Sequence, residues 1–418
     1  MTTFGYRNGH YYADDVPLRR IADDIGTPFY CYSRSAIAAN FLAYSDALRE
    51  FDALVCFAVK ANSSQAIVAQ LAGLGAGADV VSEGELRRTL AAGIAAENIV
   101  YSGVAKTARE IRFALANSIG TFNVESEQEL HAISAAAVEL GTTARIAFRI
   151  NPDVDAGTHE KISTGKLENK FGIGLDIARM AYDKARSLPG IEVRGVDLHI
   201  GSQIMDVRPF ADAFTKVADL VRTLRADGHT IDTIDLGGGL GIDYGEGEAP
   251  PLTEYARVVR DTVGDLGCRI IVEPGRSLVG NAGILVGSVI YTKTTGNSQF
   301  LIIDAAMNDF LRPSMYDAYH PIVGGEDNGA PEAVYDIVGP VCETGDTFAR
   351  RRKLPEQQPG DLVVIEACGA YGSVMASTYN TRPLIPEVMV EGGDYRLIRR
   401  RPDYDSMIGI DLPWESAS

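Results

Sequence analysis

Basic charge, cysteine and long apolar runs are all scarce in this sequence of 418 residues. Its 39 Lys and Arg residues face 56 Asp and Glu residues, which gives a net charge of −17, and the densest basic runs, 350–353 and 396–401, are short. Affinity for nucleic-acid phosphates depends on clustered Lys and Arg, so we expect no nucleic-acid partner. The same repulsion disfavours anionic membrane surfaces.

No uninterrupted apolar stretch approaches the roughly 20 residues that cross a bilayer, and the first residues, MTTFGYRNGHYYADD, contain no apolar secretory segment. The five cysteines form no C-x-x-C pair and are odd in number, which suits a reduced compartment better than a disulfide framework. We therefore expect a cytoplasmic protein without a membrane span.

Metal-ligand patterns are also missing. The six histidines show no H-E-x-x-H motif and no pair four residues apart. A zinc site needs several ligands, so we expect no metal.

Between about residues 50 and 276 the sequence repeats one pattern: a short apolar run, a polar or Gly-rich turn, and an Ala-rich helical stretch. Apolar runs that alternate with helices predict a parallel sheet covered by helices, and eight such units are the number that closes a (β/α)8 TIM-like barrel. A doubly wound open sheet is the alternative. The eight runs are residues 53–60, 78–82, 98–103, 121–126, 144–150, 194–202, 233–239 and 269–276.

After Arg276 the helical periodicity fades and strand-like segments dominate, which predicts a C-terminal all-β domain. The segment FGYRNGHYYADD near the N-terminus places an Asn-Gly turn between aromatic runs, a hairpin signal, and we expect this hairpin to join that domain. The predicted boundaries are a barrel over residues 26–276 and a β-domain over residues 1–25 and 277–418. The polar spacer 151–171 is too long for a tight connection and predicts a functional or disordered loop.

Polar side chains follow the predicted barrel strands, where TIM-barrel active sites lie. Lys60 ends the apolar run FAVK, so its amine would face a pocket. A desolvated amine loses its proton more easily, as a Schiff-base lysine requires. The alternative is a lysine that reaches bulk solvent from a strand end, and the segment alone leaves both open.

Glycines follow the seventh and eighth predicted strands. In GGGLG, residues 237–241, bare backbone amides could hold a phosphate at a helix start, although the spacing is not the dinucleotide fingerprint. In RIIVEPGR, Glu273, Gly275 and Arg276 stand within four residues, and barrels often bind phosphate near these two strands. Glycines at sharp turns are the simpler interpretation of either motif taken singly.

Three further residues have both a chemical and a structural interpretation. His199, in DLHIGSQ, is a candidate site residue or a hydrogen-bonded core histidine. Cys342, beside Glu343 in GPVCETGD, could carry a proton or simply belong to a turn. Tyr371 lies in a Gly-rich aromatic loop, where its phenol could contact a phosphate or pack.

Together, nine segments in order along almost the full chain resemble the fold type III pyridoxal-phosphate decarboxylases. No single segment decides the resemblance, but their order and their placement on barrel and β-domain are specific. They are FAVKANS, GADVVSEGEL, TGKLENKFGI, HIGSQ, DLGGGLGIDY, VEPGRSLV, FLRPSMYDAYHPI, VGPVCETGDTFA and EACGAYGSVMASTYN.

The resemblance implies that Lys60 forms a Schiff base with pyridoxal 5'-phosphate and that Asp79 lies nearby. It implies that His199 stacks on the cofactor ring and that Glu273 hydrogen-bonds the pyridine nitrogen. Contacts to the phosphate would come from Ser202, Gly237, Gly238, Gly239, Gly275, Arg276 and Tyr371.

Within the family, the sequence is most similar to members that act on diaminopimelate. Arg276, Arg312 and Tyr316 match positions that bind the distal carboxylate of that substrate, and Glu343 matches the position for its distal amine. Tyr371 is a further expected substrate contact. Diamine-forming relatives have a C-D-x-x-D pattern where this chain reads C-E-T-G-D, a departure that favours diaminopimelate.

The implied reaction is decarboxylation of meso-2,6-diaminopimelate at its D-centre to L-lysine and carbon dioxide, the last step of lysine biosynthesis, with Cys342 as the proton donor. Family members pair head to tail, so a homodimer is expected in which Cys342 and Glu343 reach the neighbouring subunit's site.

Three alternatives remain open at this stage. The substrate could be another basic amino acid, namely carboxynorspermidine, ornithine or arginine. A catalytically silent paralogue would usually have lost Lys60 or Cys342, and both are present. A racemase would need a second base and generally an arginine where Glu273 stands.

Overall fold

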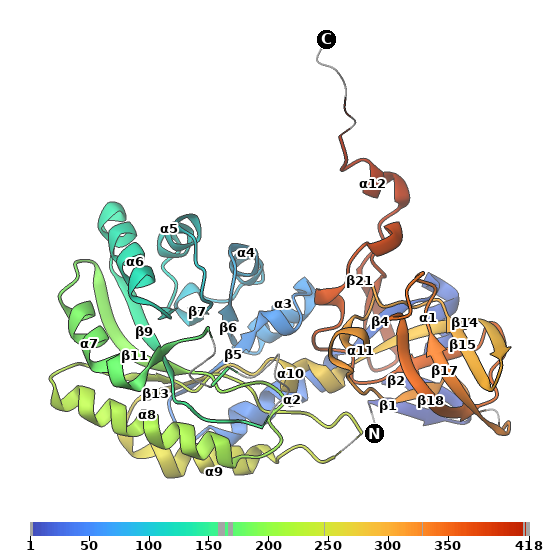
Figure 1. Cartoon of the computed structure of the whole chain (residues 1–418), viewed down its shortest axis with the longest axis horizontal. Coiled ribbons are helices and arrows are strands. Elements are labelled where there is room, and N and C mark those ends of the chain that lie inside the picture. The colour runs from blue at the N-terminus through green and yellow to red at the C-terminus, as the bar shows by residue number, and fades with distance from the viewer. Residues whose placement is uncertain are drawn as a thin grey trace. The chain divides into compact units, whose positions relative to one another are not determined.

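The computed structural model describes residues 3–157, 164–165, 170–245, 247–327, 329–412 and 414 (Figure 1). The chain forms two compact units. The barrel unit comprises Ile37–Asp243 and Gly247–Val279, and the β unit comprises Met1–Ala36, Tyr244–Glu246 and Gly280–Ser418. No helix in the described part of the chain is long and apolar enough to span a membrane.

The barrel unit contains a closed ring of eight parallel strands, in which each strand pairs with the next and β13 pairs with β5. This closure confirms the predicted barrel and excludes the open sheet. All eight predicted runs contain a strand. The strands are β5 (Ala53–Ala58), β6 (Gly77–Val80), β7 (Ile99–Tyr101), β8 (Thr121–Val124), β9 (Ala144–Asn151), β11 (Ile191–Leu198), β12 (Thr233–Asp235) and β13 (Arg269–Val272), with the two-residue β10 (Ile173–Gly174) beside β9.

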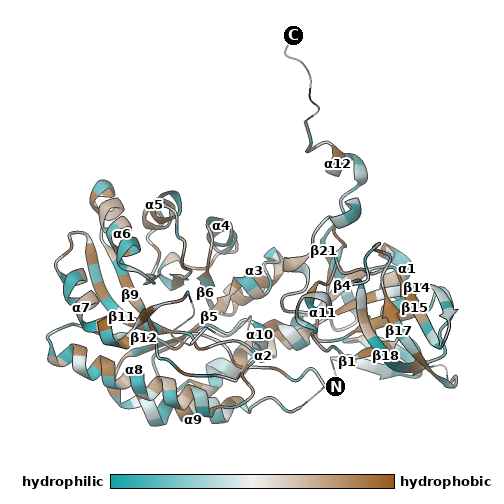
Figure 2. Cartoon of the chain, in the orientation of Figure 1, coloured by the Kyte–Doolittle hydropathy of each residue, from teal (hydrophilic) through white to brown (hydrophobic). Residues whose placement is uncertain are grey.

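Helices connect these strands, and several begin at a capping side chain. Ser82, Thr107 and Ser126 each accept a hydrogen bond from the backbone N–H three residues later, which satisfies an otherwise unpaired donor. In Figure 2, α8 and α9 alternate between hydrophilic and hydrophobic colours, as helices with one buried face do. The helices are α2 (Arg34–Ala47), α3 (Gln65–Gly73), α4 (Glu83–Ala91), α5 (Ala108–Ala116), α6 (Glu127–Leu140), α7 (Leu175–Arg186), α8 (Arg208–Ala226), α9 (Leu252–Val263) and α10 (Arg276–Val279).

The β unit is built on a nine-stranded sheet and a three-stranded sheet. The predicted Asn-Gly hairpin is confirmed as β1 and β2, and Tyr11 and Ala13 of β2 share a core cluster with Phe29, Ile284 and Val364. The strands are β1 (Phe4–Arg7), β2 (His10–Ala13), β3 (Val16–Pro17), β4 (Phe29–Ser33), β14 (Gly283–Thr295), β15 (Ser298–Ile303), β16 (Ile322–Gly324), β17 (Glu332–Val338), β18 (Thr347–Pro355), β19 (Leu362–Ile365), β20 (Glu387–Glu391) and β21 (Asp394–Arg399), and the helices are α1 (Leu18–Ile25), α11 (Arg312–Tyr316) and α12 (Tyr404–Ile408).

One boundary differs from expectation. The first division between the units falls after Ala36 and not at residue 26, because β4 pairs with β14 and β20 of the β unit. In the spacer 151–171, and in the TGKLENKFGI segment within it, residues 158–163 and 166–169 lie outside the described part of the chain.

Candidate active site

Lys60 and Asp79 form a close ion pair at the ends of neighbouring barrel strands. Lys60 follows β5 in a short 3-10 turn, Val59–Ala61, and Asp79 is on β6. The Lys60 Nζ lies 2.7 Å from Asp79 Oδ2, and the Asp79 side chain is fully buried. Burial alone would raise the pKa of Asp79, but the charges of Lys60 and His199 outweigh it and lower that pKa. The pair therefore presents an amine fixed against a buried carboxylate.

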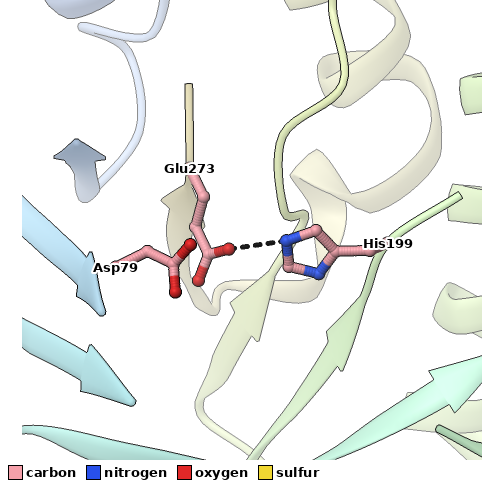
Figure 3. Close-up of side chains that lie close together, drawn as sticks. All are labelled: Asp79, His199 and Glu273. Atoms are coloured by element: carbon pink, nitrogen blue, oxygen red, sulfur yellow. Dashed lines mark ion pairs between the residues drawn. The ribbon is translucent and has the colours of Figure 1, made fainter. Parts of the chain in front are cut away.

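His199 lies between two acidic residues one residue beyond the end of β11. Its Nε2 is 2.6 Å from Glu273 Oε2 (Figure 3). Its Nδ1 is 3.2 Å from Asp197 Oδ1. Burial would lower the pKa of His199, but the two carboxylates raise it to about 9. The imidazole is accordingly protonated at neutral pH in the protein without a cofactor.

Glu273 is the most unusual group in this cluster. It directly follows β13 and is 2% exposed. Its Oε2 pairs with His199 Nε2, whereas its Oε1 has no hydrogen-bond partner among the described residues. Burial first, and then repulsion from Asp79, raise the pKa of Glu273. A buried carboxylate oxygen without a hydrogen bond is costly. A protonated ring nitrogen on a bound cofactor would supply the missing donor, so the residues present fit pyridoxal phosphate.

A metal ion is the competing interpretation of the same cluster. Ligand atoms of Asp79, His199 and Glu273 lie within 4.8 Å of one another. However, the ammonium of Lys60 already donates to Asp79, and a fixed positive charge at that position opposes a second cation. The cluster fits an aldehyde cofactor that reacts with an amine better than it fits a metal.

The glycine loop after β12 lies against the ends of the neighbouring strands. A Cβ atom on Gly237 would stand 2.3 Å from the Leu198 carbonyl oxygen, and one on Gly239 would stand 2.6 Å from that of Gly201. Both glycines also have positive φ, of 62° and 114°. Asp235 Oδ1 accepts the Gly237 N–H at 3.0 Å and fixes the loop. The expected helix start is wrong here, because α9 begins only at Leu252.

The other expected phosphate contacts of the barrel unit also lie at strand ends. Gly275 immediately precedes α10, and a Cβ there would lie 3.0 Å from the Cβ of Ala61, beside Lys60. Arg276 is 6% exposed and donates to the Ser202 hydroxyl at 3.0 Å. A guanidinium and a hydroxyl held together in this way suit an anion.

Two of the expected substrate residues of the β unit, Arg312 and Tyr316, lie on α11. Arg312 is 8% exposed, and its guanidinium lies 5.8 Å from the ring centre of Tyr316 and 5.4 Å from that of Tyr244. Tyr371 is half-buried and has a φ of 54°, a conformation that non-glycine residues rarely adopt and that is concentrated at functional positions.

Cys342 and Glu343 lie on an exposed turn. Cys342 is exposed, whereas Cys31, Cys56, Cys268 and Cys368 are buried. Glu343 accepts a hydrogen bond from the Tyr379 hydroxyl at 3.1 Å. The turn is held by Asp346, which is 3% exposed and accepts the backbone N–H groups of Met307 and Val341, each at 2.7 Å. The final Asp of C-E-T-G-D therefore supports the turn.

Three acidic residues were missed in the sequence: Asp197, Asp235 and Asp346. The first two interrupt apolar runs, in VDLH and IDLG, two residues before His199 and Gly237. A buried carboxylate in a strand covered on both faces requires a partner, and this was the available signal. Asp346 carried no comparable signal, because acidic residues are common in turns.

The barrel geometry and the pattern of its site agree with comparisons to known proteins. Residues 34–280 match the family model for the pyridoxal-binding domain of pyridoxal-dependent decarboxylases. The chain belongs to this family, with the fold type III architecture, and its cofactor is pyridoxal phosphate.

Within this family, the chain is similar to diaminopimelate decarboxylases. The diaminopimelate decarboxylase of Zymomonas mobilis is 47% identical over 98% of both chains. The crystal structure of diaminopimelate decarboxylase from Helicobacter pylori complexed with L-lysine is 44% identical, with a TM-score of 0.91 over 94% of this chain and 98% of that one. The enzyme from M. jannaschii, also in complex with L-lysine, is 38% identical, with a TM-score of 0.94 over 98% of both chains.

Proposed function

We propose that this protein decarboxylates meso-2,6-diaminopimelate at its D-centre, releasing carbon dioxide and L-lysine, as the last step of lysine biosynthesis. The observation that carries the chemistry is the buried Glu273 carboxylate, whose Oε1 has no hydrogen-bond partner among the described residues, beside the Lys60–Asp79 pair. The similarity to diaminopimelate decarboxylases, two of them solved with L-lysine bound, carries the choice of substrate.

The barrel residues hold and tune the cofactor. Pyridoxal phosphate, when bound, supplies a ring that accepts the electrons left when carbon dioxide departs. Lys60 would offer the amine that attaches to its aldehyde, and Glu273 would accept a hydrogen bond from its ring nitrogen, which favours the protonated, electron-accepting form. His199 would lie against the ring, and Asp79 would orient Lys60. Contacts to the phosphate would come from Ser202, Gly237, Gly238, Gly239, Gly275, Arg276 and Tyr371.

Residues of the β unit select the substrate and complete the reaction. The guanidinium of Arg312, with Tyr316 and with Arg276 of the barrel, binds the distal carboxylate through paired N–H donors. Glu343 binds the distal amine, and Tyr371 contacts the substrate. Cys342 donates the proton that replaces the departed carboxyl group. Its exposure and its position on a fixed turn support this assignment.

The competing substrates are separated by one assay. Release of carbon dioxide from meso-diaminopimelate is measured beside ornithine, arginine and carboxynorspermidine with the holoenzyme. We expect turnover of meso-diaminopimelate to exceed that of the others by orders of magnitude. Turnover of ornithine alone would overturn the proposal, and interconversion of stereoisomers without carbon dioxide would favour a racemase.

We propose further that the active enzyme is a homodimer with shared sites, because Cys342 and Glu343 are exposed in the isolated chain. We propose a cytoplasmic location because the five cysteines are odd in number and form no C-x-x-C pair. Mixing inactive Lys60→Ala and Cys342→Ala chains tests the shared sites. If each site combines Lys60 of one subunit with Cys342 of the other, random mixed dimers restore about a quarter of the activity. Sites contained within single chains would restore none.

A further inference from the structure

We infer that His320 is a positioning residue that sets the orientation of the substrate-selecting guanidinium of Arg312. This inference rests on the proposed function, in which Arg312 binds the distal carboxylate. His320 follows α11 in the β unit and is 2% exposed. Arg312 Nε donates to His320 Nε2 at 3.2 Å, and His320 Nδ1 lies 2.9 Å from the backbone carbonyl oxygen of Glu366.

These two contacts assign one tautomer to the imidazole of His320. A guanidinium only donates hydrogen bonds and a carbonyl oxygen only accepts them. His320 Nε2 is therefore the acceptor, and Nδ1 carries the proton that it donates to Glu366. The ring is neutral, and only this tautomer holds Arg312.

The ring itself is fixed by its surroundings. Phe310 and Tyr244 pack edge-on against it, with ring centres at 4.7 and 4.9 Å. The Glu366 N–H donates to the Pro321 carbonyl oxygen at 2.9 Å. Pro321 and Glu366 lie next to Ile322 and Ile365, which are paired in β16 and β19. The position of Nε2 is thus set by the sheet backbone.

The contact with His320 affects the fork of N–H groups that the Arg312 guanidinium presents to a carboxylate. That fork is planar, so fixing Nε fixes the plane in which the carboxylate is bound. A guanidinium held in advance loses less side-chain freedom when the substrate binds. A histidine that merely fills the core would have no such effect on substrate affinity.

Two variants of similar polarity separate these roles. In His320→Asn, the amide reaches the position of Nδ1 and keeps a donor for Glu366 but cannot reach Arg312. In His320→Gln, the amide oxygen reaches the position of Nε2 and can accept from Arg312. For meso-diaminopimelate we expect His320→Asn to raise KM roughly 10-fold to 100-fold with a smaller change in kcat, as for a lost hydrogen bond to a charged group. His320→Gln should return KM to within a few-fold of the wild type.

Cofactor absorbance and Tm should remain close to wild type in both variants. A wild-type KM in His320→Asn, or an equal rise of KM in both variants, would overturn the inference. If the Asn variant does not fold, the nitrogen NMR shifts of His320 in the wild-type holoenzyme decide: an Nε2-protonated or doubly protonated ring refutes it, and the Nδ1-protonated ring with L-lysine bound supports it. Absence of wild-type turnover of meso-diaminopimelate would instead refute the proposed function.

Discussion

The barrel unit and the β unit contribute to the proposed chemistry in different ways. The barrel gathers Asp79, His199 and Glu273 within 4.8 Å, in a buried cluster with Lys60 paired to Asp79. The β unit presents Cys342 and Glu343 on an exposed turn. One region concentrates charge away from water, and the other leaves its reactive groups in contact with it.

This difference indicates that the two units have different roles in the proposed reaction. In the buried cluster the carboxylates strongly perturb their neighbours, as the pKa of His199 near 9 shows. The cluster is therefore prepared for a cofactor by the barrel alone. The exposed turn is held in shape by Asp346, which accepts two backbone N–H groups. In the proposed homodimer, the partner subunit would cover the reactive groups of this turn.

The largest effect on turnover is expected when Lys60 of the barrel unit is replaced. Lys60→Ala removes the amine that attaches the cofactor, so the visible absorbance should disappear and turnover should fall by more than the roughly 10⁴-fold that loss of a proton donor causes. Absorbance spectroscopy and carbon dioxide release measure both effects. The control is Lys184→Ala, because Lys184 is similarly exposed, at 41% against 37%, but pairs with Glu127 on the barrel surface. A persistent band in Lys60→Ala would assign the cofactor to another lysine.

The next effect should be confined to turnover. Cys342→Ala removes the proposed proton donor on the exposed turn and leaves the barrel intact, so absorbance should be retained while kcat falls by about 10² to 10⁴. Thr344→Ala, in the same exposed turn, should keep normal activity. If Cys342→Ala turns over like the wild type, Cys342 has no part in the reaction, and the division between the two regions fails.

The same contrast explains what the sequence could predict. Continuous apolar runs marked all eight barrel strands, and the polar residues at their ends included Lys60, His199 and Glu273. Asp197 and Asp235 were missed because a single acidic residue hardly alters an apolar pattern. The place of β4 depends on β14, some 250 residues later in the chain, and no local pattern contains that pairing. The roles of the exposed turn came only from the family resemblance, and they stay predictions.

A smaller effect on kcat is expected when Glu273 of the barrel cluster is replaced. Glu273→Gln keeps the shape of the side chain but removes the charge that favours a protonated ring nitrogen. Hydrogen bonds to charged groups contribute about 1.5–3 kcal/mol, so kcat should fall by roughly 10-fold to 150-fold while cofactor absorbance is retained. Steady-state kinetics measure the fall. Unchanged kcat would mean that the charge of Glu273 does not act on the ring nitrogen and that the cluster is not prepared for the ring.

The last expected effect concerns the stability of the cofactor-free protein as a function of pH. The pKa of His199 is raised from 6.5 to about 9 on folding, so its contribution to stability is complete below pH 6.5 and is lost as the pH rises towards 9. Such a shift corresponds to about 3 kcal/mol at most. Denaturant unfolding of the cofactor-free wild type should therefore show a decline between pH 6.5 and 9, and His199→Asn should lack that part of it. Parallel declines in the two proteins would show that Glu273 and Asp197 do not hold a proton on His199, and that the barrel cluster forms its charges only once the cofactor arrives.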